Sequence, residues 1–501
     1  MFYIRDVDLA GRIGRLKLGR GDIETPAFFP VIDPIRQELG VEEIKAAGFK
    51  QVITNAYLLL RRFGDEAIRR GVHGILGFDG IVMTDSGAYQ ILEYGGIEVE
   101  QDTIIEYQKA IGSDIGVILD VPTGDVDYEK AKATVEITLK RALEALKLIE
   151  GSSVSWVLPI QGGRHLDLVE LSAREASRIP YYSIYGVGSP TEFLERYELT
   201  VVLKMIYSAK KHLPDSKPVH LFGAGHPIII PFAVALGVDM FDSASYILYA
   251  RDGRYMTDYG VYRVEELEYF PCTCPVCSRM EPRDLAELPK DERVEVLALH
   301  NLHVIKRTID RVKQSIREGR LWDYLEELSR RHPRALEALR VFRRFHRYLE
   351  LRTPHSKGEV YGLKLYSVES MWNPRVVRFR VRSWRLVETL LEGVEELLLK
   401  PLLSDEECLG GDAGVNVVYY TPYLGLVPAV ICGLYPSTQH VKSRVHDVGV
   451  LDDLVYSLRA ISAKARSRGV RVKVGYCGSL SWTLVVAMEA RMLGLDTIDL
   501  C

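Results

Sequence analysis

Between Phe28 and Asp242 the chain repeats one pattern: a short apolar run, a polar turn and a longer segment with helical periodicity. Each apolar run is short enough for a strand of a buried parallel sheet. The eight runs are Phe28–Ile32, Gln51–Thr54, Ile81–Thr84, Ile115–Leu119, Trp156–Ile160, Tyr182–Tyr185, Val219–Phe222 and Val238–Phe241. Most gaps between them suit a helix, as at Glu129–Glu150 and Glu192–His212. Eight such units over about 220 residues predict a (β/α)8 barrel.

An open, doubly wound sheet is the alternative arrangement, although no Gly-x-Gly-x-x-Gly follows the first strand to support a dinucleotide fold. Ahead of the barrel, residues 1–25 predict a small antiparallel sheet. Residues 254–303 break the repeat and predict an insertion between the eighth strand and its helix, and residues 298–350 read as helical.

The C-terminal part differs in character from the barrel. It contains β-like stretches at Val376–Val381, Val415–Tyr420 and Val470–Val474, and a helix at Leu454–Ser467. We therefore expect a catalytic barrel over residues 1–350 and one or two smaller α+β domains over residues 351–501.

Polar and glycine residues follow most of the predicted strands, at the barrel rim where active sites lie. The third strand leads into Asp85 and Ser86, the fourth into Asp120, the fifth into Gln161, the sixth into Gly186 and Val187, and the eighth into Asp242. Taken alone, Asp242 also suits a helix N-cap. Turn formation alone does not explain a carboxylate after each of three separate strands, so the pattern favours a functional site.

Asp85 and Asp242 are candidates for paired carboxylate chemistry. Such a pair suits displacement at an anomeric carbon, with one group as nucleophile and the other as acid/base. Tyr89 is placed to stack on a planar base, although an ordinary core or rim aromatic is an equal alternative.

Three of the seven cysteines form a Cys-x-Cys-x-x-Cys at Cys272, Cys274 and Cys277. Zinc needs a fourth ligand to close a structural tetrahedron, and His300 and His303 are both candidates. We expect Cys408, Cys432, Cys477 and Cys501 to be packing residues. An odd cysteine count with a metal-like cluster argues for a reducing compartment, hence the cytosol. We expect neither a signal peptide nor a membrane span.

The net charge of −4 gives no nucleic-acid signal, but the distribution of charge does. Residues 306–357 contain 15 Lys/Arg against 7 Asp/Glu, and Arg375, Arg378, Arg380, Arg382 and Arg385 follow. A solvated helical face is the plain alternative; two consecutive basic stretches favour a surface that faces a polyanion. Four Asn and eight Gln against 132 charged residues suit a thermophile.

Several motifs in order resemble the tRNA-guanine transglycosylase family. They are Asp-Ser-Gly-Ala-Tyr-Gln (85–90), Gln-Gly-Gly (161–163), Phe-Asp-Ser-Ala (241–244), the cysteine motif and His-Asn (300–301). Residues 218–227, the Tyr-Met-Thr after Arg254, and Tyr-Tyr-Thr-Pro-Tyr-Leu-Gly (419–425) resemble the archaeal branch, which makes the archaeosine precursor.

The resemblance implies roles for individual residues. Asp242 would be the nucleophile that forms a covalent ester with ribose C1′, and Asp85 the general acid/base. The base would be read by Ser86, Tyr89, Asp120, Gln161 and the backbone at Gly186 and Val187. One structural zinc would be held by Cys272, Cys274, Cys277 and His300. The reaction would replace guanine at tRNA position 15 by 7-cyano-7-deazaguanine (preQ0), and the enzyme would be a homodimer.

The sequence departs from the family in two places. No acid follows Gly186 until Glu192, which fits an uncharged nitrile better than an aminomethyl base. Archaeal members usually end in an RNA-binding PUA domain, and the sequence ends at Cys501 without room for one, so we expect a separate PUA-type protein or the basic stretches to supply that function. The alternatives are a queuine-type enzyme acting on the anticodon, a non-catalytic tRNA-binding subunit or paralogue, and a barrel glycoside hydrolase.

Overall fold

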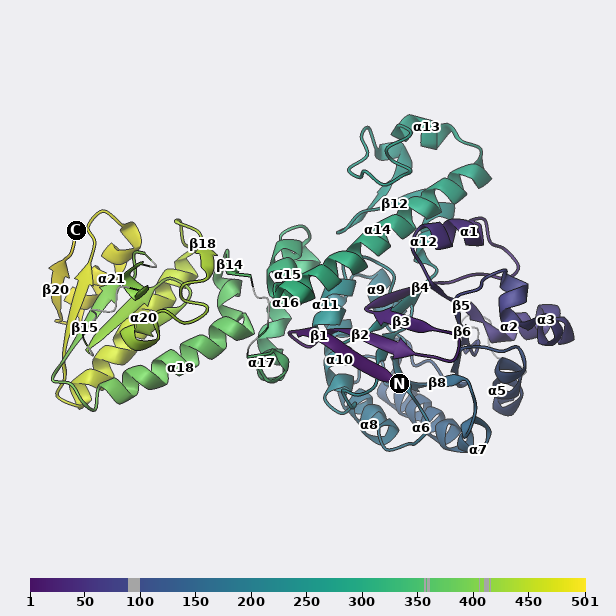
Figure 1. Cartoon of the computed structure of the whole chain (residues 1–501), viewed down its shortest axis with the longest axis horizontal. Helices are drawn as coiled ribbons and strands as arrows, with labels where there is room; N and C mark the ends of the chain where they lie inside the picture. Colours follow the sequence, from purple (N-terminus) through teal and green to yellow (C-terminus); the bar gives the residue numbers. More distant parts are fainter. Residues whose placement is uncertain (89–99, 356, 358–360, 405, 410–413, 415) are drawn as a thin grey trace. The chain divides into compact units, whose positions relative to one another are not determined.

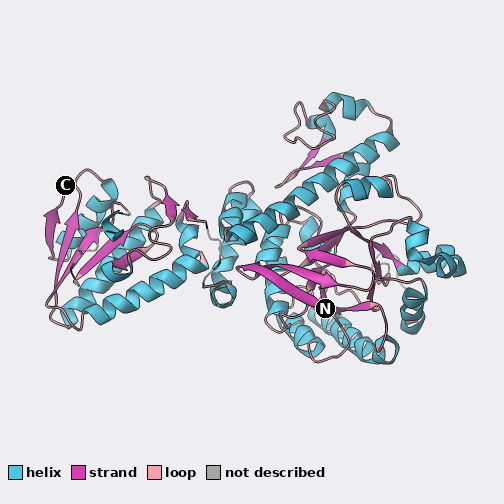
Figure 2. Ribbon diagram, in the orientation of Figure 1, coloured by secondary structure: helices cyan, strands magenta, loops and turns pink. Residues whose placement is uncertain are grey.

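A computed structural model of the chain describes residues 1–501 apart from 89–99, 356, 358–360, 405, 410–413 and 415. The chain divides into two compact units, Met1–Phe345 and His346–Cys501. Each combines strands with covering helices (Figure 2). Within the described residues, every helix is too short or too polar to cross a lipid bilayer.

The first unit is built on an eight-stranded parallel barrel (Figure 1). Its strands run in the order β4-β11-β10-β9-β8-β7-β6-β5 around the sheet. A parallel bridge between Val31 and Ile53, and a 2.8 Å bond from the Ile32 N–H to the Ile53 carbonyl, join the two ends. The strands are β4 (Ala27–Pro30), β5 (Gln51–Asn55), β6 (Ile81–Asp85), β7 (Ile115–Val117), β8 (Ser155–Ile160), β9 (Ile184–Val187), β10 (Val219–Leu221) and β11 (Met240–Ser243). The predicted barrel is confirmed, and the open sheet is excluded.

Helices cover the outside of the barrel. Their apolar residues recur every three or four positions, so each helix can bury one face against the strands. In α6, Asp127 accepts the Lys130 N–H as N-cap, and one face buries Ala131, Val135 and Ala142. The helices are α1 (Val41–Ala46), α2 (Ala56–Phe63), α3 (Asp65–Leu76), α5 (Gln101–Ala110), α6 (Tyr128–Glu144), α7 (Leu146–Ile149), α8 (Leu166–Ala176), α9 (Thr191–Glu195), α10 (Leu199–Lys210), α11 (Ile230–Ala235) and α12 (Ser245–Arg251).

The barrel interior is filled by alternate strand residues, as the pleat of a strand requires. The buried cluster includes Phe29, Ile53, Met83, Val117, Val157, Ile184 and Met240. Leu16 and Ile23 join it from the predicted N-terminal antiparallel sheet, which consists of β1 (Phe2–Asp8), β2 (Gly11–Lys17) and β3 (Asp22–Thr25).

The cysteine-containing insertion follows α12 rather than β11 itself. It opens with a hairpin of β12 (Arg254–Met256) and β13 (Val261–Arg263), followed by η1 (Val264–Glu266) and α13 (Pro282–Glu287). The long helix α14 (Lys290–Glu318) then returns to the barrel. The predicted helical region continues with α15 (Leu321–Ser329), α16 (Pro333–Val341), η2 (Phe342–Phe345) and α17 (His346–Arg352).

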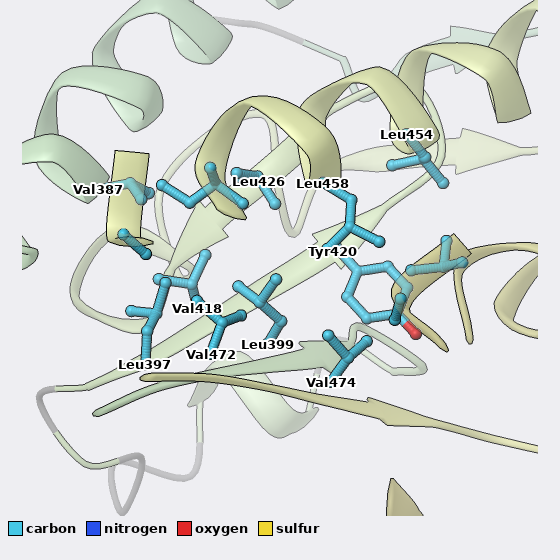
Figure 3. Close-up of a cluster of buried hydrophobic side chains, with 14 of the residues drawn as sticks. Val387, Leu397, Leu399, Val418, Tyr420, Leu426, Leu454, Leu458, Val472 and Val474 are labelled. Atoms are coloured by element: carbon cyan, nitrogen blue, oxygen red, sulfur yellow. The ribbon is translucent and has the colours of Figure 1, made fainter. Parts of the chain in front are cut away.

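The second unit contains a five-stranded sheet in the order β17-β16-β15-β19-β20, parallel except for the β16–β17 hairpin. Leu397, Leu399, Val472 and Val474 project from β15 and β19 toward Leu458 of α20 in one apolar cluster (Figure 3). The elements are β14 (Leu363–Leu365), η3 (Val368–Trp372), α18 (Pro374–Leu390), β15 (Glu396–Pro401), α19 (Glu406–Leu409), β16 (Val417–Thr421), β17 (Gly425–Pro428), η4 (Ala429–Ile431), β18 (His440–Lys442), α20 (Val448–Ser467), β19 (Arg471–Tyr476), α21 (Ser481–Met492) and β20 (Asp496–Asp499).

The predicted strand at Val376–Val381 is wrong, because this segment lies inside helix α18. Asn373 accepts the Arg375 N–H at 3.0 Å as N-cap, and Pro374 takes the first helical position. The alternation of Val and Arg resembled a strand, whereas the buried residues Val376, Phe379, Ser383 and Val387 follow helical spacing.

The prediction that the four C-terminal cysteines are packing residues is also wrong. Disulfides join Cys408 to Cys432 and Cys477 to Cys501. Disulfide-bonded cysteines do not indicate a reducing compartment, so these four residues give no support to a cytosolic location.

The basic stretch on α18 is only partly available to a polyanion. Arg378 Nε bonds Glu350 at 2.7 Å, Arg380 Nη2 bonds both oxygens of Asp453 at 2.6 and 2.8 Å, and Arg375 is buried. Of the five arginines, Arg382 and Arg385 are exposed.

Candidate functional site

Two of the three predicted carboxylates sit in one layer of the barrel because of strand alternation. Asp85 comes two residues after Met83, and Asp242 two residues after Met240, and both methionines fill the barrel interior. Residues two apart on a strand face the same side, so both carboxylates point inward above the core. The charge of Asp242 acts on the ionisation of Asp85, which places the groups within electrostatic reach.

Asp242 is buried, and its two carboxylate oxygens have different surroundings. Oδ1 accepts from Nε2 of His220 at 2.7 Å and from the Gly223 N–H at 3.1 Å. Within the described residues, no hydrogen bond reaches Oδ2. Helix α12 has Ala244 as N-cap and no side-chain cap, so the N-cap interpretation of Asp242 is excluded. An uncommitted carboxylate oxygen at the mouth of a barrel is suited to nucleophilic attack.

The surroundings of Asp85 raise its pKa toward neutral pH. Burial, and then the negative charges of Asp120 and Asp242, raise the pKa of Asp85 to about 7. Its Oδ2 accepts from the Gly87 N–H at 3.2 Å, which opposes the rise without cancelling it. Gly87 has φ +94°, and a side chain there would meet Tyr57, so the turn after β6 requires glycine. A group with this pKa both gives and takes a proton at pH 7.

Asp120 and Gln161 form a buried pair beside the carboxylates. Gln161 Nε2 donates to Asp120 Oδ2 at 2.5 Å. Gln161 Oε1 accepts three bonds of 3.0 Å, from the N–H and the hydroxyl of Thr123 and from the Ser189 hydroxyl. The amide orientation is therefore fixed, and toward a ligand Gln161 acts as a donor. Burial raises the pKa of Asp120 to about 6, although the bond from Gln161 lowers it.

Of the other predicted base-reading residues, Gly186 and Val187 lie in β9, and Ser86 directly follows β6. Gly186 lies in β9, and a side chain there would come 2.3 Å from the Phe222 ring, so the strand needs glycine at this point. Val187 follows it and is buried. Ser86 is fully buried, and its hydroxyl has no hydrogen-bond partner within the described residues. Tyr89 lies outside the described residues.

Sequence reasoning missed the residues that hold these groups in place. His220 and Gly223 fix Asp242, Asn55 approaches Asp85 at 3.5 Å, and Thr123 and Ser189 orient Gln161. One signal was present: His220 is a polar residue within the apolar strand Val219–Leu221.

Four donors in the insertion converge on one point. The ligand atoms of Cys272, Cys274, Cys277 and His300 all lie within 4.8 Å of one another. Tetrahedral zinc with Zn–S bonds of about 2.3 Å needs sulfur atoms roughly 3.8 Å apart, so the group could hold such an ion. His303, the competing candidate, is not part of it.

The histidine is oriented as a metal ligand. His300 Nε2 lies 3.0 Å from the Met256 carbonyl, and Nδ1 lies 3.4 and 3.3 Å from the sulfurs of Cys274 and Cys277. A proton on Nε2 leaves the Nδ1 lone pair facing the sulfurs, which is the arrangement a metal requires. The ring also stacks on Tyr255, with centroids 3.8 Å apart.

Comparison with known proteins identifies the family. The family described as Queuine tRNA-ribosyltransferase matches residues 8–334. The tRNA-guanine(15) transglycosylase of Aeropyrum pernix is 54% identical over 513 residues, covering 100% of both chains. That of Sulfolobus acidocaldarius is 45% identical over 468 residues, covering 91% of this chain and 92% of the relative. That of Pyrococcus furiosus is 44% identical over 396 residues, covering 78% and 67%. With two inward carboxylates on its barrel and this degree of identity, the chain belongs to the queuine tRNA-ribosyltransferase family.

Proposed function

We propose that this chain is a tRNA-guanine(15) transglycosylase that replaces guanine at position 15 of tRNA by preQ0 through a covalent intermediate. The observation that carries the proposal is the carboxylate layer, in which Asp242 has one uncommitted oxygen and Asp85 a pKa of about 7. The relatives named tRNA-guanine(15) transglycosylase support the choice of nucleotide.

The exchange takes two displacements at ribose C1′. Asp242 Oδ2 attacks C1′, the bond to guanine N9 breaks with its electron pair moving to the base, and Asp85 supplies a proton to the departing guanine. The incoming preQ0 then gives a proton to Asp85 and attacks C1′ through its ring nitrogen. This second attack breaks the ester and releases Asp242 as carboxylate.

The base is read by the residues beside this layer. Asp120 accepts from the N–H groups of the guanine-type edge, and Gln161 donates its second amide hydrogen to the base carbonyl. Ser86 and the backbone at Gly186 and Val187 complete the contacts, with Tyr89 stacking on the ring. The absence of a carboxylate between Gly186 and Glu192 favours the uncharged nitrile of preQ0.

Zinc is the metal we propose for Cys272, Cys274, Cys277 and His300. Four protein ligands leave no open position, so the ion stabilises the insertion and takes no part in the exchange.

The whole chain acts on tRNA, as a homodimer and in the cytoplasm. Residues 1–350 form the transglycosylase domain with its insertion at about 254–303, and residues 351–501 help position the tRNA. Either the exposed basic residues or a separate PUA-type protein supplies the contact with the RNA backbone.

Trapping the covalent intermediate tests the proposal. The full chain is incubated with an unmodified tRNA transcript and run on a denaturing gel, beside Asp242→Asn, which keeps the shape of the side chain. We expect a denaturation-stable tRNA adduct with the natural protein, and none with the variant. tRNA affinity should change by less than about threefold, because only the attacking oxygen is lost. Base exchange by Asp242→Asn would overturn the nucleophile assignment.

A further inference from the structure

The buried imidazole of His220 has no part in the exchange chemistry described above. It lies in β10, is fully buried, and sits beside the rings of Phe29 and Phe222, with centroid distances of 5.9 and 4.6 Å. Its Nε2 contacts Asp242 Oδ1 at 2.7 Å. On the other side of the ring, no protein group in the described residues bonds Nδ1.

These surroundings specify the tautomer of the ring. A proton on Nδ1 would leave a buried N–H donor without an acceptor among aromatic side chains, which is costly. A proton on Nε2 is instead donated to the carboxylate of Asp242. The neutral Nε2–H form therefore gives Nε2 a partner and leaves only the Nδ1 lone pair, and no N–H, without one.

The two donors to Asp242 converge on the same oxygen. His220 Nε2 and the Gly223 N–H both bond Oδ1, at 2.7 and 3.1 Å. Rotation of the carboxylate would break both bonds, so the orientation that leaves Oδ2 uncommitted is the preferred one.

We propose that neutral His220 is the positioning residue of Asp242: it holds Oδ1 so that Oδ2 faces the ribose C1′. This inference rests on the proposed function, because it assigns Asp242 as the nucleophile. His220 then acts through Asp242, and its loss slows bond formation without changing how tRNA or base binds.

Two substitutions separate the hydrogen bond from the packing. Leucine at this position fills similar space but donates nothing, whereas the amide of glutamine reaches as far as imidazole Nε2 and donates without carrying charge. We expect His220→Leu to lower kcat for guanine exchange about 10- to 100-fold, the usual effect of losing a bond to a charged group. His220→Gln should stay within about threefold, and KM for tRNA and guanine within about twofold in both variants.

Three kinetic results would overturn the positioning role. They are an unchanged kcat in His220→Leu, an equal loss in the glutamine variant, and a raised KM with kcat preserved. Thermal unfolding of each variant is measured in parallel. A loss of kcat that is explained by a lower unfolding temperature would also count against the positioning role.

The ring itself provides a test that does not depend on activity. In the full chain, ¹⁵N NMR of the His220 imidazole should show a neutral ring with protonated Nε2 and bare Nδ1. Asp242→Asn should shift the Nε2 resonance. A doubly protonated ring, or an Nε2 resonance that Asp242→Asn leaves unchanged, would contradict the proposal. If the natural protein exchanges no base while the ring behaves as expected, the proposed function fails and the hydrogen bond stands.

Discussion

At the scale of single residues, three carboxylates share one barrel rim but have different surroundings. Asp242 is held at one oxygen by two donors, Asp120 receives an amide, and Asp85 faces the charges of the other two. Burial raises the pKa of Asp85 to about 7 and that of Asp120 to about 6. The proposed division of roles between nucleophile, base reader and proton carrier rests on these contacts rather than on residue type.

Asp85→Asn tests the proton carrier. Removing the carboxyl should lower kcat about 10²- to 10⁴-fold while leaving tRNA affinity nearly unchanged, because general acid/base catalysis has this magnitude. In the natural protein, single-turnover guanine release should fall as pH rises above about 7, where Asp85 loses its proton. A release rate that is flat across this range would contradict the assignment.

The same substitution has a predicted effect on stability. A carboxyl whose pKa is raised in the folded chain binds its proton more tightly than in the unfolded chain, so stability falls as pH rises from about 4 to 7. Asp85→Asn removes that loss and should increase the free energy of unfolding at pH 8 by up to about 4 kcal/mol, with little change near pH 4. Denaturant unfolding at both pH values measures it; a variant less stable at pH 8 would contradict it.

At the scale of elements, we expect the insertion after α12 to depend on a metal ion held by its cysteine–histidine cluster. The segment between β13 and α13 has few regular elements, and four ligands from the loop and from α14 are drawn together. A short, loop-rich segment of this kind would gain stability from an ion bound to these ligands.

Cys274→Ser should abolish stoichiometric zinc and expose the insertion to proteolysis. Cys432→Ser is the matched control, because Cys432 lies in the second unit and is paired with Cys408. Elemental analysis of the purified variants measures the metal. One zinc per chain in Cys274→Ser would contradict the ligand set.

The sequence predicted elements better than it predicted contacts between them. All eight barrel strands lie within two residues of their predicted ends, because buried parallel strands are apolar and separated by helices. The α18 helix was misread because Arg378 and Arg380 alternate with apolar residues, although Asn373 and Pro374 mark a helix start. The bond between His220 and Asp242 could not be predicted, since it depends on how β10 and β11 pair. Cysteine pairing is likewise not encoded in spacing.

At the scale of the whole molecule, the proposed substrate is a polyanion and the chain is acidic overall. Many of its cations already pair with acidic residues: Arg307 with Asp258, Arg311 with Glu327, and Arg380 with Asp453. We therefore expect RNA contact to involve exposed cations that these acidic residues do not pair with.

Arg382 and Arg385 are the exposed cations of α18, and the double variant Arg382→Ala/Arg385→Ala should weaken tRNA binding about tenfold. The slope of log affinity against log salt should fall by about 1.5, because each phosphate contact releases counterions. Lys140→Ala, an exposed cation on the barrel helix α6, is the control that should leave the slope unchanged. An unchanged slope in the double variant would remove α18 from the RNA interface.

The proposed activity is base exchange at one nucleotide, and the position at which labelled base enters tRNA tests it directly. The full chain is incubated with an unmodified transcript and either labelled guanine or labelled preQ0, and the label is mapped by nuclease digestion. We expect label at position 15 from both bases, and none when Asp242→Asn replaces the natural protein. Label in the anticodon, or incorporation by Asp242→Asn, would contradict it.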